Sequence, residues 1–188
     1  AERGDLQNGV TYDYPKFPVR GVVEGFYGKP WRREQRLDMM RFIASQNMNA
    51  YVYGPKDDAY HRSRWREPYD DEAFGTLNEA FRTAESLGLR FCYSIAPGLS
   101  MRYSSDEDYG CLLRKTRQIF DLGVRWFGLF LDDIPDRLQH PEDIAAFPDL
   151  AAAHARLANR YYADLREWDA AAELTVCPTQ YWSRGNEY

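Results

Sequence analysis

The feature that most constrains the fold of this chain is a regular alternation of short apolar segments with longer segments of helical periodicity. Apolar runs of strand length fall at residues 21–26, 50–53, 90–95, 126–131 and 173–177. Four helical patterns separate them: one over about 33–46, one from Phe74 to a stop at Gly88, one from the capping pair Ser105 and Asp108 to Gly123, and one over 150–168. Such alternation predicts an α/β fold of parallel strands joined by right-handed crossovers.

Two α/β architectures compete, a (β/α)₈ barrel of the TIM type and an open doubly wound sheet of the flavodoxin type. A barrel places functional residues at the carboxyl ends of its strands. Here polar or turn-forming residues follow four strands, at 25–28, 54–58, 132–133 and 179–181. The glycine pattern that binds phosphates in doubly wound sheets does not follow the first strand, so the barrel is favoured.

The number of predicted elements is smaller than a barrel requires. The sequence predicts about five strands and four helices over 188 residues, whereas a full barrel has eight of each over about 250 residues. We therefore expect residues 1–18 to be a leader segment and residues 19–188 to be the N-terminal portion of a barrel catalytic domain. An open half-barrel would expose strand edges, which predicts a C-terminal half-barrel as partner or self-association.

Composition and charge exclude several classes of function. A formal net charge of −5 argues against a nucleic-acid-binding protein. The basic segment 61–66 precedes a run of acids, and is predicted to be a solvated, salt-bridged loop. No apolar stretch is long enough to span a membrane, and no signal-peptide core is present. The expectation is a soluble protein, either cytoplasmic or secreted with its signal removed.

The cysteines and histidines suggest packing residues and no cofactor. Cys92 and Cys177 fall in predicted strands and are expected to be buried thiols. His154 lies on the apolar stripe of the last helix, where a hydrogen-bonded packing role is expected. The spacing of cysteine and histidine matches no zinc site, so neither a metal nor another cofactor is predicted.

The candidate chemistry lies at Asp132 and Asp133, which end the apolar run of the fourth predicted strand. Like charges at neighbouring positions disfavour ionisation of both carboxyls, and enzymes use such pairs to keep one protonated and one charged. Aromatic residues form 15% of the chain, and aromatic rings commonly serve as platforms in sugar-binding clefts. The alternative is structural: Asp133 caps a turn and Asp132 forms a salt bridge.

Four motifs in this order resemble glycoside hydrolase family 84, which holds the O-GlcNAcases and related bacterial β-N-acetylglucosaminidases, some of them called hyaluronidases. The resemblance covers nearly everything from about Arg20 onward. The four motifs are Val23-Glu24-Gly25-Phe26-Tyr27-Gly28-Lys29-Pro30-Trp31, Tyr53-Gly54-Pro55-Lys56-Asp57-Asp58 with His61-Arg62 and Trp65-Arg66-Glu67, Leu131-Asp132-Asp133-Ile134, and Cys177-Pro178-Thr179-Gln180-Tyr181.

The resemblance implies a retaining β-N-acetylglucosaminidase that uses substrate-assisted catalysis. The 2-acetamido oxygen of the sugar attacks the anomeric carbon and forms an oxazoline, so no protein nucleophile is needed. Asp132 would orient the acetamido N–H, and Asp133 would be the general acid and then the base. Strand alternation would point Asp132 into the barrel mouth and let Asp133 curl over the rim, where the charge of Asp132 and partial burial favour its protonated form.

The resemblance also implies a set of substrate-binding residues. Gly25 would offer its backbone to a sugar hydroxyl, or else be required for packing. Lys56 would bind sugar hydroxyls, Tyr181 would donate to the acetamido oxygen, and Tyr27 would line the pocket. Asp57 and Asp58 are predicted to be structural residues at a turn. The implied partner is a glycan or glycoprotein bearing N-acetylglucosamine; a catalytically incomplete carbohydrate-binding or scaffold fragment is the alternative.

Overall fold

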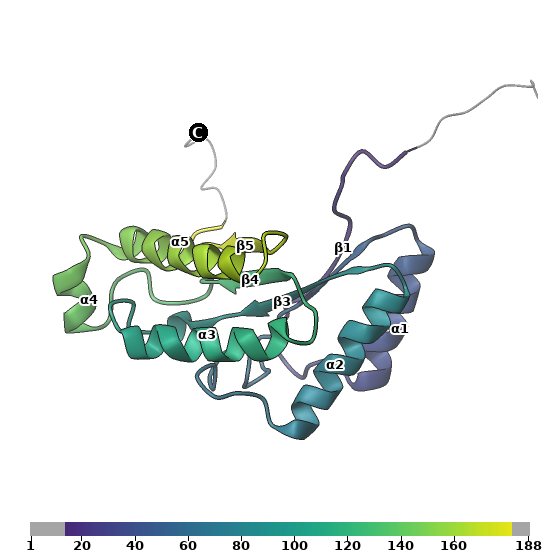
Figure 1. Cartoon of the computed structure of the whole chain (residues 1–188), viewed down its shortest axis with the longest axis horizontal. Coiled ribbons are helices and arrows are strands. Elements are labelled where there is room, and N and C mark those ends of the chain that lie inside the picture. Colours follow the sequence, from purple (N-terminus) through teal and green to yellow (C-terminus); the bar gives the residue numbers. More distant parts are fainter. Residues whose placement is uncertain (1–13, 182–188) are drawn as a thin grey trace, which may run out of the picture.

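The computed structural model describes residues 14–181 and shows a five-stranded parallel sheet whose strands follow one another in chain order. The strands are β1 (Gly21–Glu24), β2 (Ala50–Tyr53), β3 (Arg90–Ile95), β4 (Trp126–Phe130) and β5 (Glu173–Cys177). The helices are α1 (Arg33–Ser45), α2 (Asp71–Ser86), α3 (Asp106–Phe120), α4 (Pro141–Ala146) and α5 (Leu150–Trp168), with a short 3₁₀ turn, η1 (Pro97–Leu99). Figure 1 shows their arrangement.

Local sequence signals explain where the long helices begin. The side chain of Asp70 accepts from the backbone N–H of Ala73 at the start of α2, and Asp149 accepts from that of Ala152 at the start of α5. Ser105 accepts from the N–H of Asp108 at the start of α3, as the capping pair predicted. Each cap supplies an acceptor for an N–H group that the helix itself cannot satisfy.

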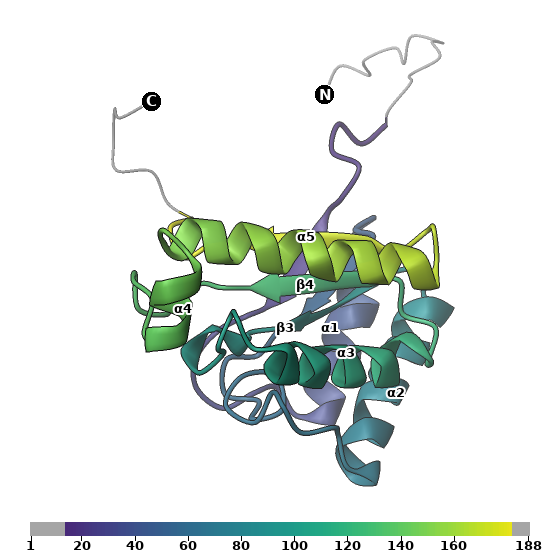
Figure 2. The ribbon, with the colours of Figure 1, turned by 60° about the vertical axis from the view of Figure 1, so that its left-hand side comes forward.

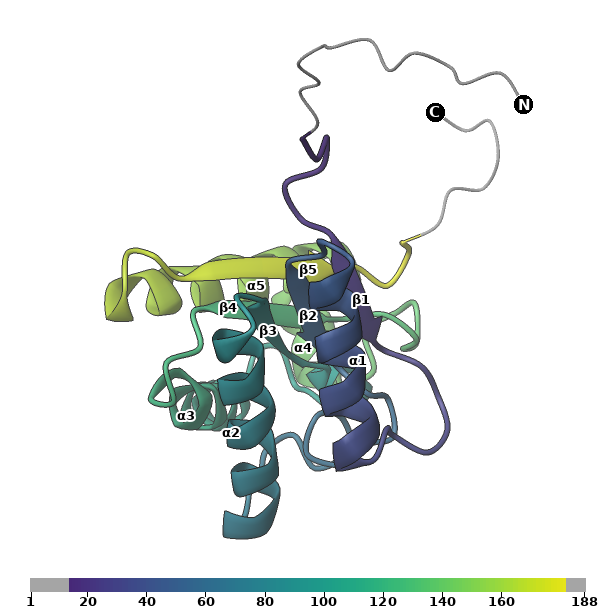
Figure 3. The same cartoon turned by 90° about the vertical axis from the view of Figure 1, so that its right-hand side faces the viewer.

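The core lies between the sheet and the helices that cover one of its faces. Phe91 on β3 packs edge-on against Phe81 of α2, with ring centroids 5.8 Å apart. Phe127 on β4 stacks against Phe120 of α3 at 6.3 Å. Figure 3 shows α1 and α2 side by side below the sheet with α3 beside them, and Figure 2 shows α5 running alongside β4.

The opposite face of the sheet includes more exposed side chains. Val23 on β1 is largely exposed, and the Trp126 indole on β4 donates to the hydroxyl of Thr175 on β5. Successive parallel strands with crossover helices on the outer face are the repeating unit of a (β/α)₈ barrel, in which this opposite face becomes the interior. The α/β barrel prediction is thus confirmed for the five strands and the crossovers between them.

The predicted elements differ from the structure at the ends of two strands and in one additional helix. The first strand ends at Glu24 instead of 26 and the fourth at Phe130 instead of 131, differences within the usual uncertainty of strand ends. The short helix α4 was not predicted; Pro141 occupies its first turn, and its buried Asp143 accepts from the backbone N–H groups of Tyr103 and Ser104. Of the predicted leader, residues 1–13 lie outside the described residues, and 14–18 form no helix or strand.

Candidate active site

Asp132 and Asp133 lie just beyond the carboxyl end of β4, at the edge of the sheet where barrel enzymes bind substrate. Pairing with the neighbouring strand continues past β4, since the N–H of Leu131 donates to the carbonyl oxygen of Cys177 at 2.8 Å and Thr179 Oγ1 donates to that of Leu131 at 2.8 Å. Asp133 then adopts a left-handed conformation with φ of 54°. The backbone thus leaves the extended conformation at Asp133, where the sequence predicted that the strand breaks into its loop.

Lys56, from the loop after β2, lies between the two carboxyls. Its ammonium donates to Asp132 Oδ2 and lies 3.7 Å from Asp133 Oδ2. The side chains of Lys56 and Asp132 are only 4% and 11% exposed, whereas that of Asp133 is 34% exposed. Asp132 is therefore the buried member of the pair, and Asp133 is the member that an incoming ligand can reach.

Asp132 has one carboxylate oxygen whose hydrogen-bonding capacity is unused. Oδ2 is bound by Lys56, but Oδ1 is buried and has no hydrogen-bond partner among residues 14–181. A buried polar atom of this kind costs free energy unless a donor reaches it. The site thus presents a fixed carboxylate oxygen to a donor from outside the described residues.

Tyr27 and Arg62 surround Asp133. The Tyr27 hydroxyl donates to Asp133 Oδ2 at 2.8 Å. One Arg62 nitrogen donates to the Tyr27 oxygen at 2.8 Å, and another donates to the backbone carbonyl oxygen of Asp133 at 2.8 Å. The Arg62 guanidinium also lies over the Tyr27 ring, 5.4 Å from its centroid. Tyr27, which the sequence suggested as a pocket residue, contacts the second acid directly.

Tyr181 and Cys177 approach the same two acids from the β5 side. The negative charge of Asp133 is the main cause of the raised pKa of Tyr181, and Asp132 and Tyr27 contribute. Desolvation raises the pKa of the Cys177 thiol, with smaller effects from Asp132, Lys56 and Asp133. The structure therefore brings Tyr181 into the electrostatic neighbourhood of the carboxyl pair. Both thiols were predicted to be buried; Cys92 is buried, whereas Cys177 is only half-buried.

Gly25 follows β1 directly and is half-buried. Among the described residues, a Cβ at this position would meet only Val23 Cγ1, at 3.1 Å. Packing against other elements therefore does not require glycine here, and the backbone is open to close approach. A groove of about 430 Å³ lies beside the residues that contact the two acids. It is lined by Tyr27, Lys56, Arg62 and Leu99, among others.

His61 is a buried neutral residue beneath the site. Its Nδ1 lies 2.8 Å from the carbonyl oxygen of Ser94, an acceptor that fixes the proton on Nδ1. Desolvation lowers the pKa of His61 to about 4. The packing around it is tight, because a Cβ at Gly54 would lie 2.3 Å from Ser94 Oγ and 3.4 Å from His61 Cε1.

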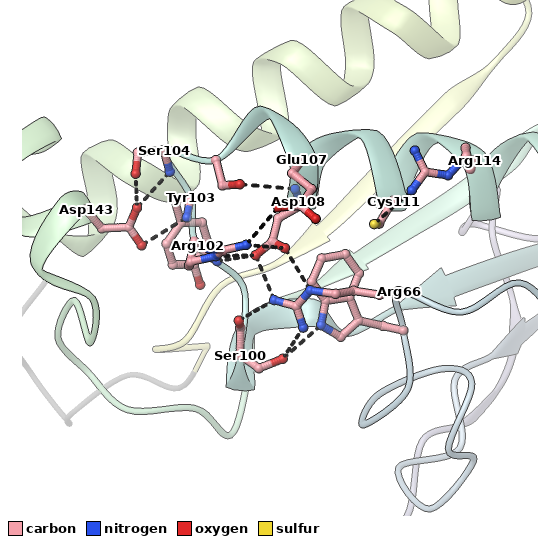
Figure 4. Close-up of polar contacts among 12 residues, drawn as sticks. Arg66, Ser100, Arg102, Tyr103, Ser104, Glu107, Asp108, Cys111, Arg114 and Asp143 are labelled. Atoms are coloured by element: carbon pink, nitrogen blue, oxygen red, sulfur yellow. Dashed lines mark hydrogen bonds and ion pairs between the residues drawn. The ribbon is translucent and has the colours of Figure 1, made fainter.

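Helix α3 holds the loop that carries Lys56, His61 and Arg62. Asp108, in the first turn of α3, accepts two hydrogen bonds of 2.7 Å from Arg66, whose guanidinium also donates to Ser100 (Figure 4). Two turns further along, the buried Lys115 ammonium donates to the carbonyl oxygens of Tyr60 and Glu67 at 2.6 Å. The loop is thus fixed from outside by two charged residues of one helix.

These contacts correct the prediction of a solvated loop at 61–66. His61, Arg62 and Trp65 are buried, and only the Arg64–Glu67 pair has the exposed, salt-bridged character that was expected. Arg62 is the site residue that the sequence reasoning missed. Its presence beside Lys56 in the second motif was the available signal, but its partner Asp133 is 71 residues away.

The remaining polar predictions are accounted for by local contacts. Asp57 accepts from the N–H of Gly28, and Asp58 accepts from the hydroxyl of Tyr53 and the N–H of Tyr60, which is the structural role expected of them. His154 Nε2 lies 3.0 Å from the Tyr103 hydroxyl, which confirms a hydrogen-bonded packing role.

Within residues 14–181 no group of histidine, cysteine and acidic side chains is arranged to hold a metal ion. None of the helices described is both long and apolar enough to cross a bilayer.

Parallel β/α units with two adjacent carboxyls and a buried lysine at the carboxyl ends of the strands define the class of barrel glycosidases. The comparisons with known proteins are more specific. The family model of beta-N-acetylglucosaminidase matches residues 20–188, and the chain belongs to this family, glycoside hydrolase family 84.

Relatives and solved structures agree with this assignment. The chain is 38% identical over 161 residues to Protein O-GlcNAcase of Rattus norvegicus and of Mus musculus, a match over 86% of this chain and 17% of each relative. A mutant of the Thermobaculum terrenum O-GlcNAc hydrolase superposes with a TM-score of 0.88 at 42% identity, over 90% of this chain and 37% of that one. For CpGH84B the TM-score is 0.79 at 35% identity, over 90% of this chain and 29% of that one. The chain thus matches about a sixth of the length of the two curated relatives.

Proposed function

We propose that this chain supplies the catalytic acids of a retaining β-N-acetylglucosaminidase that removes terminal N-acetylglucosamine from glycoconjugates, including glycoproteins, through an oxazoline intermediate. Membership of the family and the names of the relatives, which are O-GlcNAc hydrolases, support the reaction and the sugar. We further propose that residues 19–188 form the N-terminal portion of the barrel, because the five strands follow one another in chain order.

The observation that carries the proposal is the unpartnered Oδ1 of Asp132. A substrate-assisted reaction needs a carboxylate that accepts the acetamido N–H, orients the acetamido oxygen and stabilises the positive charge that develops on the group. Asp132 meets this need: it is buried, it is held by Lys56 through Oδ2, and its Oδ1 points to no donor among residues 14–181. An amide N–H from a bound sugar would satisfy that oxygen.

Asp133 suits the role of general acid and then base. It is the more exposed of the two acids, and the backbone leaves the direction of the strand at Asp133. Lys56 stabilises the pair by its charge, so binding of sugar hydroxyls by Lys56 would have to share the ammonium with Asp132. Gly25 leaves room for a hydroxyl near the backbone. The effect of the Asp133 charge on the Tyr181 hydroxyl supports a role of Tyr181 at the acetamido oxygen.

The reaction requires only groups that the chain or the substrate provides. The acetamido oxygen displaces the leaving oxygen, which takes the proton from Asp133, and the oxazoline forms as Asp132 holds the N–H. Asp133 then removes a proton from water as that water opens the oxazoline, which restores both carboxyls and gives the retained anomer. No metal or other cofactor has a place in this scheme.

The test uses the protein at its full natural length and its Asp133→Ala variant. We expect the unmodified protein to hydrolyse aryl N-acetyl-β-glucosaminides but not the matching β-glucosides, which lack the acetamido group. Asp133→Ala should lose about 10²- to 10⁴-fold in kcat/KM on a substrate with a poor leaving group and far less on an activated one, because only the former needs a proton. Equal losses on both substrates would contradict the role of Asp133. Sugar binding without any turnover by the unmodified protein would instead favour a carbohydrate-binding scaffold.

A further inference from the structure

Arg62 is a buried residue whose side chain reaches out of its own loop to the surroundings of Asp133. It is 8% exposed and donates to two acceptors that both belong to the surroundings of one acid, the Tyr27 hydroxyl oxygen and the backbone carbonyl oxygen of Asp133. Both distances are 2.8 Å. Neither acceptor belongs to the loop that carries Arg62. This side chain therefore connects the second motif to the segments that follow β1 and β4.

The first contact determines the direction of the Tyr27 hydrogen bond. A guanidinium only donates, so the Tyr27 oxygen must accept from Arg62 and its own proton is left to donate elsewhere. That proton points to Asp133 Oδ2, which lies 2.8 Å from the hydroxyl oxygen of Tyr27. Lys56 also approaches this oxygen, at 3.7 Å. The described contacts of the Asp133 carboxyl therefore fall on Oδ2, which leaves Oδ1 as the oxygen to carry a transferable proton.

The second contact acts on the backbone. A non-glycine residue in the left-handed region is disfavoured, although aspartate tolerates it better than most residues. Asp133 has φ of 54°, and its carbonyl oxygen is held by Arg62. The same guanidinium thus fixes the main chain of Asp133 and, through Tyr27, the rotation of its carboxyl.

We propose that Arg62 is a positioning residue for the general acid, which selects the carboxyl oxygen of Asp133 that delivers the proton to the leaving group. The inference rests on the proposed function, because it gives Asp133 the role of general acid. It concerns only proton delivery: the acetamido side of the reaction, at Asp132, does not involve Arg62.

A leaving-group series in the protein at its full natural length tests this role. The variants are Arg62→Met, Arg62→Lys, Tyr27→Phe and the double variant Arg62→Met/Tyr27→Phe. Arg64→Met is the matched control, since Arg64 lies two residues away in the same loop. Among residues 14–181 its side chain contacts the exposed Glu67 and the Tyr60 ring and no residue of the site. The substrates are methyl N-acetyl-β-glucosaminide, whose leaving group needs a proton, and the 2,4-dinitrophenyl glycoside, whose leaving group does not.

We expect Arg62→Met to lose about 10- to 100-fold in kcat/KM on the methyl glycoside and less than about threefold on the activated one. Tyr27→Phe should likewise lose more kcat/KM on the methyl glycoside than on the activated one. The double variant should lose less than the product of the single losses, because both residues act on one carboxyl. Arg62→Lys, which can reach one acceptor only, should lie between Arg62→Met and the unmodified protein. Arg64→Met should match the unmodified protein.

The outcomes separate this inference from the function on which it rests. Equal losses of Arg62→Met on both substrates, or no loss on either, would overturn the positioning role while Asp133→Ala still showed its dependence on the leaving group. If Arg62→Met does not fold, Tyr27→Phe and Arg62→Lys decide the question, and Tyr27→Phe changes a largely exposed residue. If the ratio of kcat/KM on the two glycosides is unchanged in both variants, the inference is refuted. Failure of the unmodified protein to hydrolyse either glycoside would instead refute the proposed function.

Discussion

The buried ion pair between Glu24 and Arg36 offers a direct test of how the first motif is supported. Glu24 is the last residue of β1, one position before Gly25, and Arg36 lies in the first turns of α1. Their side chains are 0% and 6% exposed, and they share two hydrogen bonds of 2.7 and 2.8 Å. The Tyr51 hydroxyl is a third donor to the same carboxylate.

Replacing Arg36 by methionine should cost much more than the loss of an ordinary ion pair. The substitution removes two of the three donors and leaves a fully buried carboxylate without a counter-charge, which costs about 3–5 kcal/mol in comparable cases. An exposed pair contributes only about 0–1 kcal/mol. Arg41 and Asp38 form such a pair on the same helix, with side chains 59% and 73% exposed, so Arg41→Met is the matched control.

Hydrogen exchange followed by mass spectrometry can measure this cost locally in the protein at its full natural length. Amides in β1 and α1 should exchange roughly 10²- to 10⁴-fold faster in Arg36→Met, since each 1.36 kcal/mol is a factor of ten. In Arg41→Met the same amides should change by less than about fivefold.

A double variant separates the pair from its position. Glu24→Met combined with Arg36→Met removes both charges, and replacement of a buried ion pair by apolar side chains is often close to neutral. The double variant should therefore recover most of the protection that Arg36→Met loses. Exchange in Arg36→Met that matches Arg41→Met, or a double variant worse than Arg36→Met, would refute the reasoning.

Three further predictions follow from single contacts. Asp132→Asn should lower kcat/KM by about 10²- to 10³-fold on activated and poor substrates alike, because Asp132 acts on the acetamido group and not on the leaving group; initial rates on both test this. Gly54→Ala, whose Cβ would lie 2.3 Å from Ser94 Oγ, should destabilise β2 by about 1–3 kcal/mol in hydrogen exchange, whereas Gly75→Ala, with open space around it, should not. Burial lowers the pKa of His154 to about 4, whereas in the unfolded chain this side chain binds a proton below about pH 6.5. The free energy of unfolding should therefore fall as the pH drops from about 6.5 to 4. Acid unfolding of His154→Gln should show a smaller fall.

Most of the fold could be predicted because its signals are local. The limits of β2, β3 and β5 agree with the apolar runs at 50–53, 90–95 and 173–177, each of which is followed within two residues by glycine or proline. The caps of the helices are read from residues three apart. The helix α4 escaped prediction because only six residues form it, and its buried Asp143 is held by Tyr103 and Ser104 from a distant segment.

The candidate site was predictable only where its residues stand in motifs. The juxtaposition of Lys56, Tyr27 and Tyr181 with the two acids follows from their places after successive strands, since the carboxyl ends of parallel strands meet at one edge of the sheet. Their partners did not follow from the sequence. Arg62 was expected to be solvated in a charged segment, but a contact across 71 residues holds it in the site. Lys115 was not singled out in the sequence, and its partner Tyr60 is 55 residues away.

The loop after β2 shows why a long charged segment can be rigid enough to carry part of a site. A segment without helix or strand must satisfy its backbone carbonyls by other donors if it is buried, and Lys115 does so at Tyr60 and Glu67. Asp108 lies seven residues, or two turns, before Lys115 on the same face of α3, and it holds Arg66. The loop is thus fixed on its outer side by opposite charges of one helix, which leaves Lys56 and Arg62 on its inner side in contact with Asp132 and Asp133. The geometry of the acids therefore depends on α3, although no residue of α3 contacts them in the described structure.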